Sequence, residues 1–383
     1  MITSHSRSTQ VKYARWLWIG LVCTVGLLLA VAAVDAMSAT GPAVPIAQSS
    51  TTSAETNATG DATFPFAHSL LVAHLIGEVR QSGVYSYVGY LSGEFPISVG
   101  GQPFTLKTRN MYYTSSIAKA TQYVYEFMQA QGLSVAYHEW YDAGEDLSGR
   151  NVIGVLTGTV RPAEIVLISA HLDNMPEKSV APGADDNASG SVAVMVAAAG
   201  MAGHQFQRTV RFVFFTGEEQ GLLGSDAYAK ATKARGDNIV AVYNMDMIGW
   251  DANQDGVMAL ETRYKSSPGY SSDLAIAGIF TQVVKTYGLT GLRPFVDACN
   301  DQWVDSASFW KVGYPSVTAI EEWDEGNPYY HTANDTLATL NLSFFTSIVK
   351  ASVGTVAHLA IPVDSSFATR KIYLPLVMKW FNN

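Results

Sequence analysis

Cysteine is scarce in this sequence of 383 residues, which contains only Cys23 and Cys299. Cys23 lies in an apolar N-terminal segment that we expect to leave during export, so Cys299 would remain alone. A lone cysteine is more often a small buried apolar residue than a nucleophile. The sequence therefore excludes a fold that depends on internal disulfides.

Basic residues are also few, because 24 Lys and Arg stand against 33 Asp and Glu. The formal net charge is −9 and no long basic run is present, which argues against a nucleic-acid partner. Charged residues of both signs make up only 15% of the chain, whereas hydrophobic residues make up 48%. This composition is typical of a globular protein with a large core.

The N-terminus combines positive charge with an apolar run. Arg7, Lys12 and Arg15 precede an uncharged stretch over residues 16–34, and small residues follow that stretch. The pattern is typical of an export signal, and its length is close to the roughly 20 residues that span a bilayer. We therefore expect residues 1–36 to be a cleaved export signal or a retained membrane anchor. The rest of the protein would be secreted or extracytoplasmic, with no other membrane contact.

Composition divides the remaining chain as well. Residues 37–63 are rich in Ser, Thr, Ala and Gly, which suits a flexible linker. From there to about residue 360 the sequence shows no second linker and no repeat. We therefore expect one domain over residues 64–362, followed by a C-terminal tail over residues 363–383.

Hydrophobic patterns in this domain alternate between two types. Helical spacing covers residues 115–131, 191–202, 221–231, 272–287 and 342–359. Strand-like apolar runs cover residues 133–140, 151–157, 165–170, 211–215, 239–245 and 316–320. Strands that alternate with helices form mostly parallel sheets with helices on both faces. The sequence therefore predicts an α/β fold, a single three-layer domain with a central, mostly parallel (mixed) sheet flanked by helices.

Ionisable residues follow three of these predicted strands. His171 and Asp173 follow the run that ends at residue 170, and Glu218 and Glu219 follow the run that ends at residue 215. Asp246 follows directly after the run that ends at residue 245. Because the carboxyl ends of parallel strands share one edge of the sheet, where ligands bind, we expect these side chains to form one site.

Two loops add further candidates. The loop over residues 183–190 (GADDNASG) carries adjacent carboxylates just before a predicted helix. An Asp or Asn there would cap the helix or face a metal ion, and both roles can occur together. The loop over residues 327–336 contributes His331.

Adjacent glutamates in an apolar setting indicate a divalent cation, because unpaired like charges are costly to bury. One of the pair would bind the ion while the other moves protons. Two histidines and three or four carboxylates, without cysteine, suit zinc, with manganese and cobalt as alternatives. A carboxylate that bridges two ions about 3.5–4 Å apart would explain why so many acidic residues gather.

Five motifs in the order HLD, GADDNASG, GEEQGLLGS, NMDMIG and NPYYHT resemble the bacterial leucyl aminopeptidase family of co-catalytic di-zinc metallopeptidases. The resemblance extends from about residue 109 to residue 336. It implies two zinc ions per chain, with one carboxylate shared between them. The implied metal ligands are His171, Asp186, Glu219, Asp246 and His331, of which Asp186 is the shared one.

The resemblance also implies catalytic roles. Glu218 matches the general base, Asp173 matches the residue that orients His171, and Tyr330 matches a tyrosine that helps to hold the oxyanion. The implied activity is hydrolysis of N-terminal residues from peptides or proteins with a free N-terminus. Aromatic residues near His331 favour an uncharged, apolar first side chain in the substrate.

The chain departs from the family pattern at a few positions. Ser306 stands where many members have a histidine, and Trp303 falls where some have an arginine. A glutaminyl cyclase-like single-zinc transferase and a carboxypeptidase-type relative are alternatives on the same fold. A non-catalytic domain is disfavoured, because all five ligand positions and Glu218 are present.

Overall fold

An eight-stranded sheet with the order β3-β4-β6-β5-β7-β10-β8-β9 forms the centre of the domain. Its strands are β3 (Ser134–Asp142), β4 (Leu147–Leu156), β5 (Arg161–His171), β6 (Arg208–Phe215), β7 (Asn238–Met245), β8 (Val257–Glu261), β9 (Arg293–Asp297) and β10 (Ser316–Glu321). Four neighbouring pairs are parallel and three are antiparallel. The predicted α/β fold with a mostly parallel, mixed sheet is thus confirmed.

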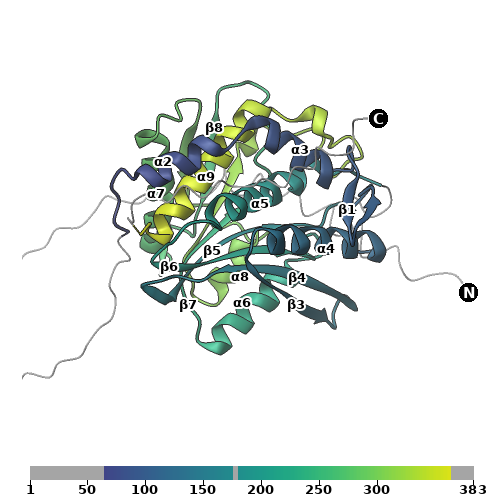
Figure 1. Cartoon of the computed structure of the whole chain (residues 1–383), viewed down its shortest axis with the longest axis horizontal. Helices are drawn as coiled ribbons and strands as arrows, with labels where there is room; N and C mark the ends of the chain where they lie inside the picture. The colour runs from purple at the N-terminus through teal and green to yellow at the C-terminus, as the bar shows by residue number, and fades with distance from the viewer. Residues whose placement is uncertain (1–63, 176–179, 364–383) are drawn as a thin grey trace, which may run out of the picture. The chain divides into compact units, whose positions relative to one another are not determined.

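Helices cover both faces of this sheet, as Figure 1 shows. One face carries α4 (Thr114–Ala130), α5 (Gly190–Met201), α7 (Tyr270–Thr286) and α9 (Leu342–Ala360), with α2 (Leu70–Glu78) and α3 (Gln81–Leu91) packed onto them. The other face carries α6 (Leu223–Arg235) and α8 (Ser306–Lys311). A small hairpin, β1 (Ile97–Val99) and β2 (Gln102–Phe104), packs against α4. Short turns complete the fold: η1 (Ala184–Ser189), η2 (Trp323–Glu325) and η3 (Leu337–Thr339).

Alternation along β5 explains the two cores. Val166, Ile168 and Ala170 face the core under α5 and α9, whereas Ile165 and Leu167 face the core under α6 and α8. Successive strand residues point to opposite faces, so a strand that is apolar throughout must be covered on both sides. The small side chains of α5 are almost all buried, which lets this helix lie between the sheet and its helical neighbours.

The computed structural model describes residues 64–175 and 180–363. The predicted export signal or anchor, the predicted linker and the tail beyond residue 363 lie outside the described residues. Within the described part, α9 is the one helix long and apolar enough to cross a membrane, but 78% of its apolar window is buried. Helix α9 is therefore a core helix of the domain.

Several elements were not predicted from the sequence. Strands β8 and β9 extend the sheet beyond β10, and each has only five residues. Strand β9 is mostly exposed and contains Pro294, a residue that sheets accept at their edges. Strand β8 (VMALE) is too short for a periodic pattern, and the edge strand β9 is half-polar, so only the sheet itself defines them.

Candidate metal centre and active site

The predicted site residues meet at one edge of the sheet. Strands β5, β6 and β7 are neighbours, and their carboxyl ends deliver His171, the Glu218–Glu219 pair and Asp246. Turn η1 brings Asp186 to the same place, and the loop after η2 brings His331. The five predicted metal ligands therefore form one group, although they are spread over 160 residues of sequence.

The two carboxylate oxygens of Asp186 lie between the two histidines. Asp186 Oδ1 lies 3.3 Å from His171 Nε2, which is also 3.2 Å from Asp246 Oδ1. Asp186 Oδ2 lies 3.1 Å from His331 Nε2, which is also 2.9 Å from Glu219 Oε2. The five side chains thus form two groups of three donors, each with one histidine, and the groups share Asp186.

This donor set fits divalent metal ions. Ligand atoms of His171, Asp186 and Glu219 all lie within 4.8 Å of one another. Within the described residues, His331 Nε2 and Glu219 Oε1 are buried and have no well-aligned hydrogen-bond partner. Both atoms are therefore available to bind a metal ion. Zinc binds to histidine nitrogen and carboxylate oxygen, and both kinds of atom gather at this buried site.

The pKa values of the clustered side chains also indicate a site for cations. Burial raises the pKa of Glu219 to about 7, and the neighbouring carboxylate of Asp186 adds to the increase. Burial lowers the pKa of His171 and His331, but the surrounding carboxylates outweigh it and raise both pKa values well above the usual value. Clustered carboxylates thus retain protons on the histidines, and bound cations would replace these protons.

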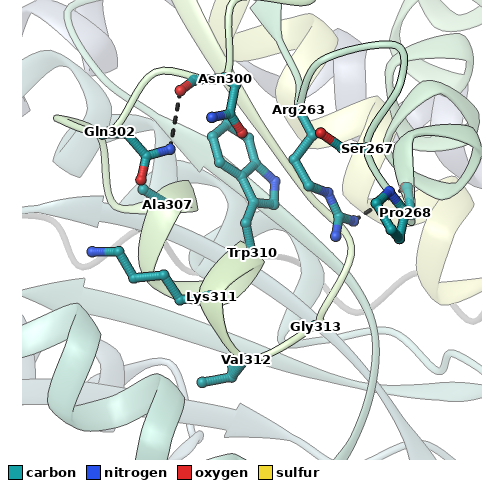
Figure 2. Close-up of a pocket in the computed structure, with 11 residues that line it drawn as sticks. Arg263, Ser267, Pro268, Asn300, Gln302, Ala307, Trp310, Lys311, Val312 and Gly313 are labelled. Carbon is teal, nitrogen blue, oxygen red and sulfur yellow. Dashed lines mark hydrogen bonds between the residues drawn. The ribbon is translucent and has the colours of Figure 1, made fainter.

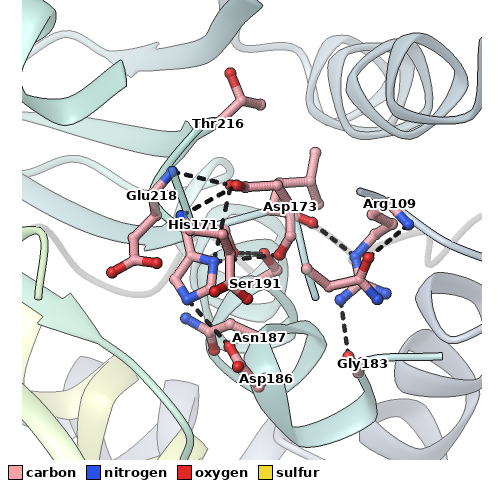
Figure 3. Close-up of polar contacts among 12 residues, drawn as sticks. Arg109, His171, Asp173, Gly183, Asp186, Asn187, Ser191, Thr216 and Glu218 are labelled. Atoms are coloured by element: carbon pink, nitrogen blue, oxygen red, sulfur yellow. Dashed lines mark hydrogen bonds and ion pairs between the residues drawn. The ribbon is translucent and has the colours of Figure 1, made fainter. Parts of the chain in front are cut away.

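Asp173 fixes the backbone that carries the two glutamates (Figure 3). Its oxygens Oδ1 and Oδ2 accept 3.4 Å hydrogen bonds from the amides of Glu218 and Glu219, respectively. The main-chain carbonyl of Asp173 lies 3.2 Å from His171 Nδ1, whereas its carboxylate is 3.8 Å away. A carbonyl only accepts hydrogen bonds, so Nδ1 is the protonated nitrogen and Nε2 is left for a metal ion. The main chain of Asp173 therefore makes the closer contact with His171.

Glu218 lies beside the ligands and is not one of the five. Burial raises the pKa of its carboxyl well above the usual value, and the carboxylates of Glu219, Asp246 and Asp305 add to this effect. A raised pKa means that this carboxylate binds a proton more tightly than an exposed glutamate does, which suits a general base.

Arg109 is a supporting residue that the sequence did not reveal. Its guanidinium is fully buried and donates to the carbonyls of Leu172, Leu91, Pro182 and Gly183 at 2.6–2.7 Å. Burial lowers its pKa to about 10, so it remains charged at neutral pH. Figure 3 shows its contact with Gly183, directly before turn η1. Arg109 therefore ties the end of β5 to the turn that carries Asp186.

Asp335 positions the shared carboxylate from the other side. Its Oδ1 accepts from the amide of Asp185 at 2.8 Å, and its Oδ2 accepts from the amide of Asp186 at 3.0 Å. The helix-capping role expected for this loop falls to Asn187, whose Oδ1 accepts from the amide of Gly190. Asp185 does not cap a helix, because it accepts from Gly249 and from the Asn327 side chain.

The remaining sequence candidates occupy distinct places. Tyr330 stacks on His331 with ring centroids 3.8 Å apart, and burial raises the pKa of its hydroxyl, with further increases from Asp186, Glu219 and other site carboxylates. Ser306, the residue in place of a histidine, shares hydrogen bonds of 2.7 Å with the hydroxyls of Ser316 and Thr318. Tyr330 therefore faces the metal centre, whereas Ser306 links α8 to β10.

A cavity of about 660 Å³ beside α8 is separate from this centre (Figure 2). It is lined by Arg263, Trp310 and Lys311 among others, and by none of the predicted site residues. The guanidinium of Arg263 is paired with Asp273 through contacts of 2.7 and 2.8 Å. Its charge is therefore already compensated within the fold.

The matches to known sequences cover the part of the chain that contains the site. Residues 151–356 match Peptidase family M28, and this range contains all five predicted ligands. Leucine aminopeptidase 1 of Arthroderma otae is 31% identical over 271 residues, which cover 66% of this chain and 70% of that protein. Leucine aminopeptidase 1 of Trichophyton rubrum is 28% identical over 304 residues, or 76% of each chain.

Solved structures share the fold. The LapA aminopeptidase of Legionella pneumophila superposes with a TM-score of 0.65 at 20% identity, covering 80% of this chain and 79% of that one. A glutaminyl cyclase of Fimbriiglobus ruber gives a TM-score of 0.58 at 16% identity, covering 73% and 96%. The family match spans more than half of the sequence and includes the five predicted metal ligands. The chain therefore belongs to peptidase family M28, as one of its metallo-aminopeptidases.

Proposed function

We propose that this protein removes N-terminal residues from peptides with two zinc ions and with Glu218 as the general base. One zinc ion would be held by His171, Asp186 and Asp246, and the other by Asp186, Glu219 and His331. The position of Asp186 supports this proposal most directly, because each of its oxygens faces a different histidine at 3.1–3.3 Å. A site for one ion would not need a carboxylate shared in this way.

The protein side chains supply the proton transfers and the orientation. Bound zinc contributes Lewis-acid polarisation of the peptide carbonyl and lowers the pKa of a bound water toward ~7. Glu218 accepts a proton from the attacking water and then donates it to the departing amine. Asp173 holds the backbone of Glu218 in place, and the hydroxyl of Tyr330 donates to the developing oxyanion.

Charge favours the N-terminus of the substrate over its C-terminus. The acidic side chains at the site leave a negative potential that suits an ammonium group. A substrate carboxylate would need a basic partner, and Arg109 cannot serve, because its guanidinium is buried among four backbone carbonyls. The geometry therefore favours an aminopeptidase over a carboxypeptidase.

Blocked peptides test this assignment. We expect N-acetylation of a good peptide substrate to abolish cleavage, because it removes the ammonium charge, while C-terminal amidation leaves kcat/KM nearly unchanged. Chromatography of the products after digestion measures both effects. Cleavage of the acetylated peptide, together with loss of cleavage on amidation, would show a carboxypeptidase.

A glutaminyl cyclase is the second candidate, because a protein with that name shares the fold. A peptide that begins with glutamine separates the two reactions. Hydrolysis releases glutamine and shortens the peptide, whereas cyclisation releases ammonia and leaves the number of residues unchanged. Mass spectrometry of the product distinguishes them, and we expect the shortened peptide.

We also propose that the enzyme acts outside the cytoplasm, with residues 1–36 as export signal or anchor. This rests on the basic residues that precede the apolar stretch 16–34. We expect the protein in the extracytoplasmic or membrane fraction, and an N-terminus beyond about residue 33 if the signal is cleaved. Recovery of the soluble full-length chain from the cytoplasm would contradict this proposal.

A further inference from the structure

Glu261, at the end of β8, carries a buried carboxylate to which the reaction assigns no role. The residue is only 7% exposed, and within the described part of the chain its Oε2 has no hydrogen-bond partner, although the thiol of Cys299 hydrogen-bonds to the same carboxylate. Ligand-type atoms of Glu261, Asp297 and Cys299 lie within 4.8 Å of one another. The basic residue nearest in sequence, Arg263, is paired with Asp273 instead. A buried carboxylate without a counter-charge is costly unless a cation binds there.

Strand register places this carboxylate near the metal centre. Glu261 pairs with Thr318 of β10, and Thr318 pairs with Asn244 of β7, so the three residues form one row on the same sheet face. Asp246 follows Asn244 by two residues. Asp246 also contributes to the raised pKa values of Glu261 and Asp301, after burial and nearer groups. Glu261 and the metal ligand Asp246 therefore lie close enough for their charges to interact.

An apolar cluster lies between the metal ligands and Glu261. The cluster consists of Met247, Ala259 and Ile320, with Tyr330 packed against it. Met247 directly follows the ligand Asp246, and Ala259 precedes Glu261 by two residues on the same face of β8. Tyr330 stacks on the ligand His331. The cluster is therefore bounded by metal ligands at one end and by acidic groups at the other.

We propose that Glu261, together with Asp297 and Asp301, binds the cationic side chain of the first substrate residue, so that the enzyme prefers N-terminal lysine or arginine. This rests on the proposed aminopeptidase function. The alkyl stem would lie against the apolar cluster, and the charged end would reach the carboxylates. Glu261 lies two strands across the sheet and two residues along it from Asp246, about 12 Å at ~4.8 Å per strand and ~3.3 Å per residue, which selects a long side chain.

The aromatic residues near His331 favour an uncharged first side chain, whereas the buried carboxylate of Glu261 favours a cationic one. Glu261 was not recognisable from the sequence. We favour a side chain with a hydrocarbon stem over a divalent ion, because the residues between the metal ligands and this acidic group are apolar and suit an alkyl stem.

The test is kinetic and uses metal-replete enzyme with anilides of lysine, arginine, leucine and norleucine. We expect kcat/KM for the two basic anilides to exceed that for the two apolar ones by about tenfold or more. Glu261→Gln should lower kcat/KM for lysine by about 10- to 100-fold, mostly through KM, and leave leucine within about threefold. Glu145→Gln, on an exposed turn, is the matched control and should change nothing.

Binding and metal content provide independent readouts. Lysinamide should inhibit the wild-type enzyme more strongly than leucinamide, and Glu261→Gln should remove this difference. The proposal fails if leucine is preferred and Glu261→Gln leaves the ratio unchanged, whereas the aminopeptidase function then stands. It also fails if Glu261→Gln removes a third metal ion, which would make the acidic group a metal site. Absence of cleavage of every anilide would overturn the proposed function as well.

Discussion

Glu218→Gln should lower kcat by about 10²- to 10⁴-fold while the enzyme retains two zinc ions per chain. Glutamine has nearly the same shape as glutamate but cannot accept a proton. Glu218 is not among the five clustered donors, so its loss should not disturb metal binding. Steady-state kinetics and elemental analysis of the same preparation measure the two effects.

Glu219→Gln is the matched control, since the two glutamates are adjacent in sequence. Glu219 Oε2 lies 2.9 Å from His331 Nε2, so this variant should lose metal affinity, and added zinc should restore part of its activity. Identical behaviour of the two variants would refute the division between base and ligand. A reproducible content of one zinc ion in fully active wild-type enzyme would refute the shared role of Asp186.

Arg109→Met should lower the free energy of unfolding by about 3 kcal/mol or more, and should weaken zinc binding. The substitution removes a donor from four carbonyls, of which that of Gly183 still accepts from the amide of Ala188. The other three lose their donor, and each buried acceptor left unsatisfied costs about 1–3 kcal/mol. Two of these carbonyls, those of Pro182 and Gly183, directly precede the turn that carries Asp186. Urea unfolding with and without a chelator separates the loss of fold stability from the loss of metal affinity.

Arg80→Met is the control for removing an arginine at the surface. Arg80 is largely exposed and pairs with the exposed Glu78, so its loss should change the free energy of unfolding by no more than about 0.5 kcal/mol. If Arg109→Met unfolded at the same urea concentration as Arg80→Met, Arg109 would not be the link that we describe.

The order of strands and helices was predictable because it depends on local patterns. The run over residues 165–170 is apolar throughout, and it forms the part of β5 that is buried on both faces. The helix expected over residues 115–131 differs from α4 by one residue at each end. Strands β8 and β9 were missed, because five residues are too few for a clear pattern and become a strand only when a neighbouring strand is present to pair with them.

The candidate ligands were also recognisable, since each belongs to a short motif placed at a strand end or in a loop. Their common location follows from the direction of the parallel strands, which the alternation of strands and helices already implies. The motifs did not predict that one oxygen of Asp186 would contact His171 and the other would contact His331. That division depends on the position of turn η1 relative to two distant segments of chain.

The sequence by itself determined six of the eight strands of the sheet and the main helices that cover it, the residue types at the strand ends and the choice of metal chemistry, because these depend on neighbours along the chain. Only the tertiary structure decided the supporting contacts. Asp335 reaches the amide of Asp185 across 150 residues, and Arg109 joins segments that are 18 to 74 residues away. Glu261 becomes a buried carboxylate with an unsatisfied Oε2 only when β10 and β9 flank β8. Burial and pairing of polar groups depend on contacts between distant segments, and such contacts leave no periodic pattern in the sequence.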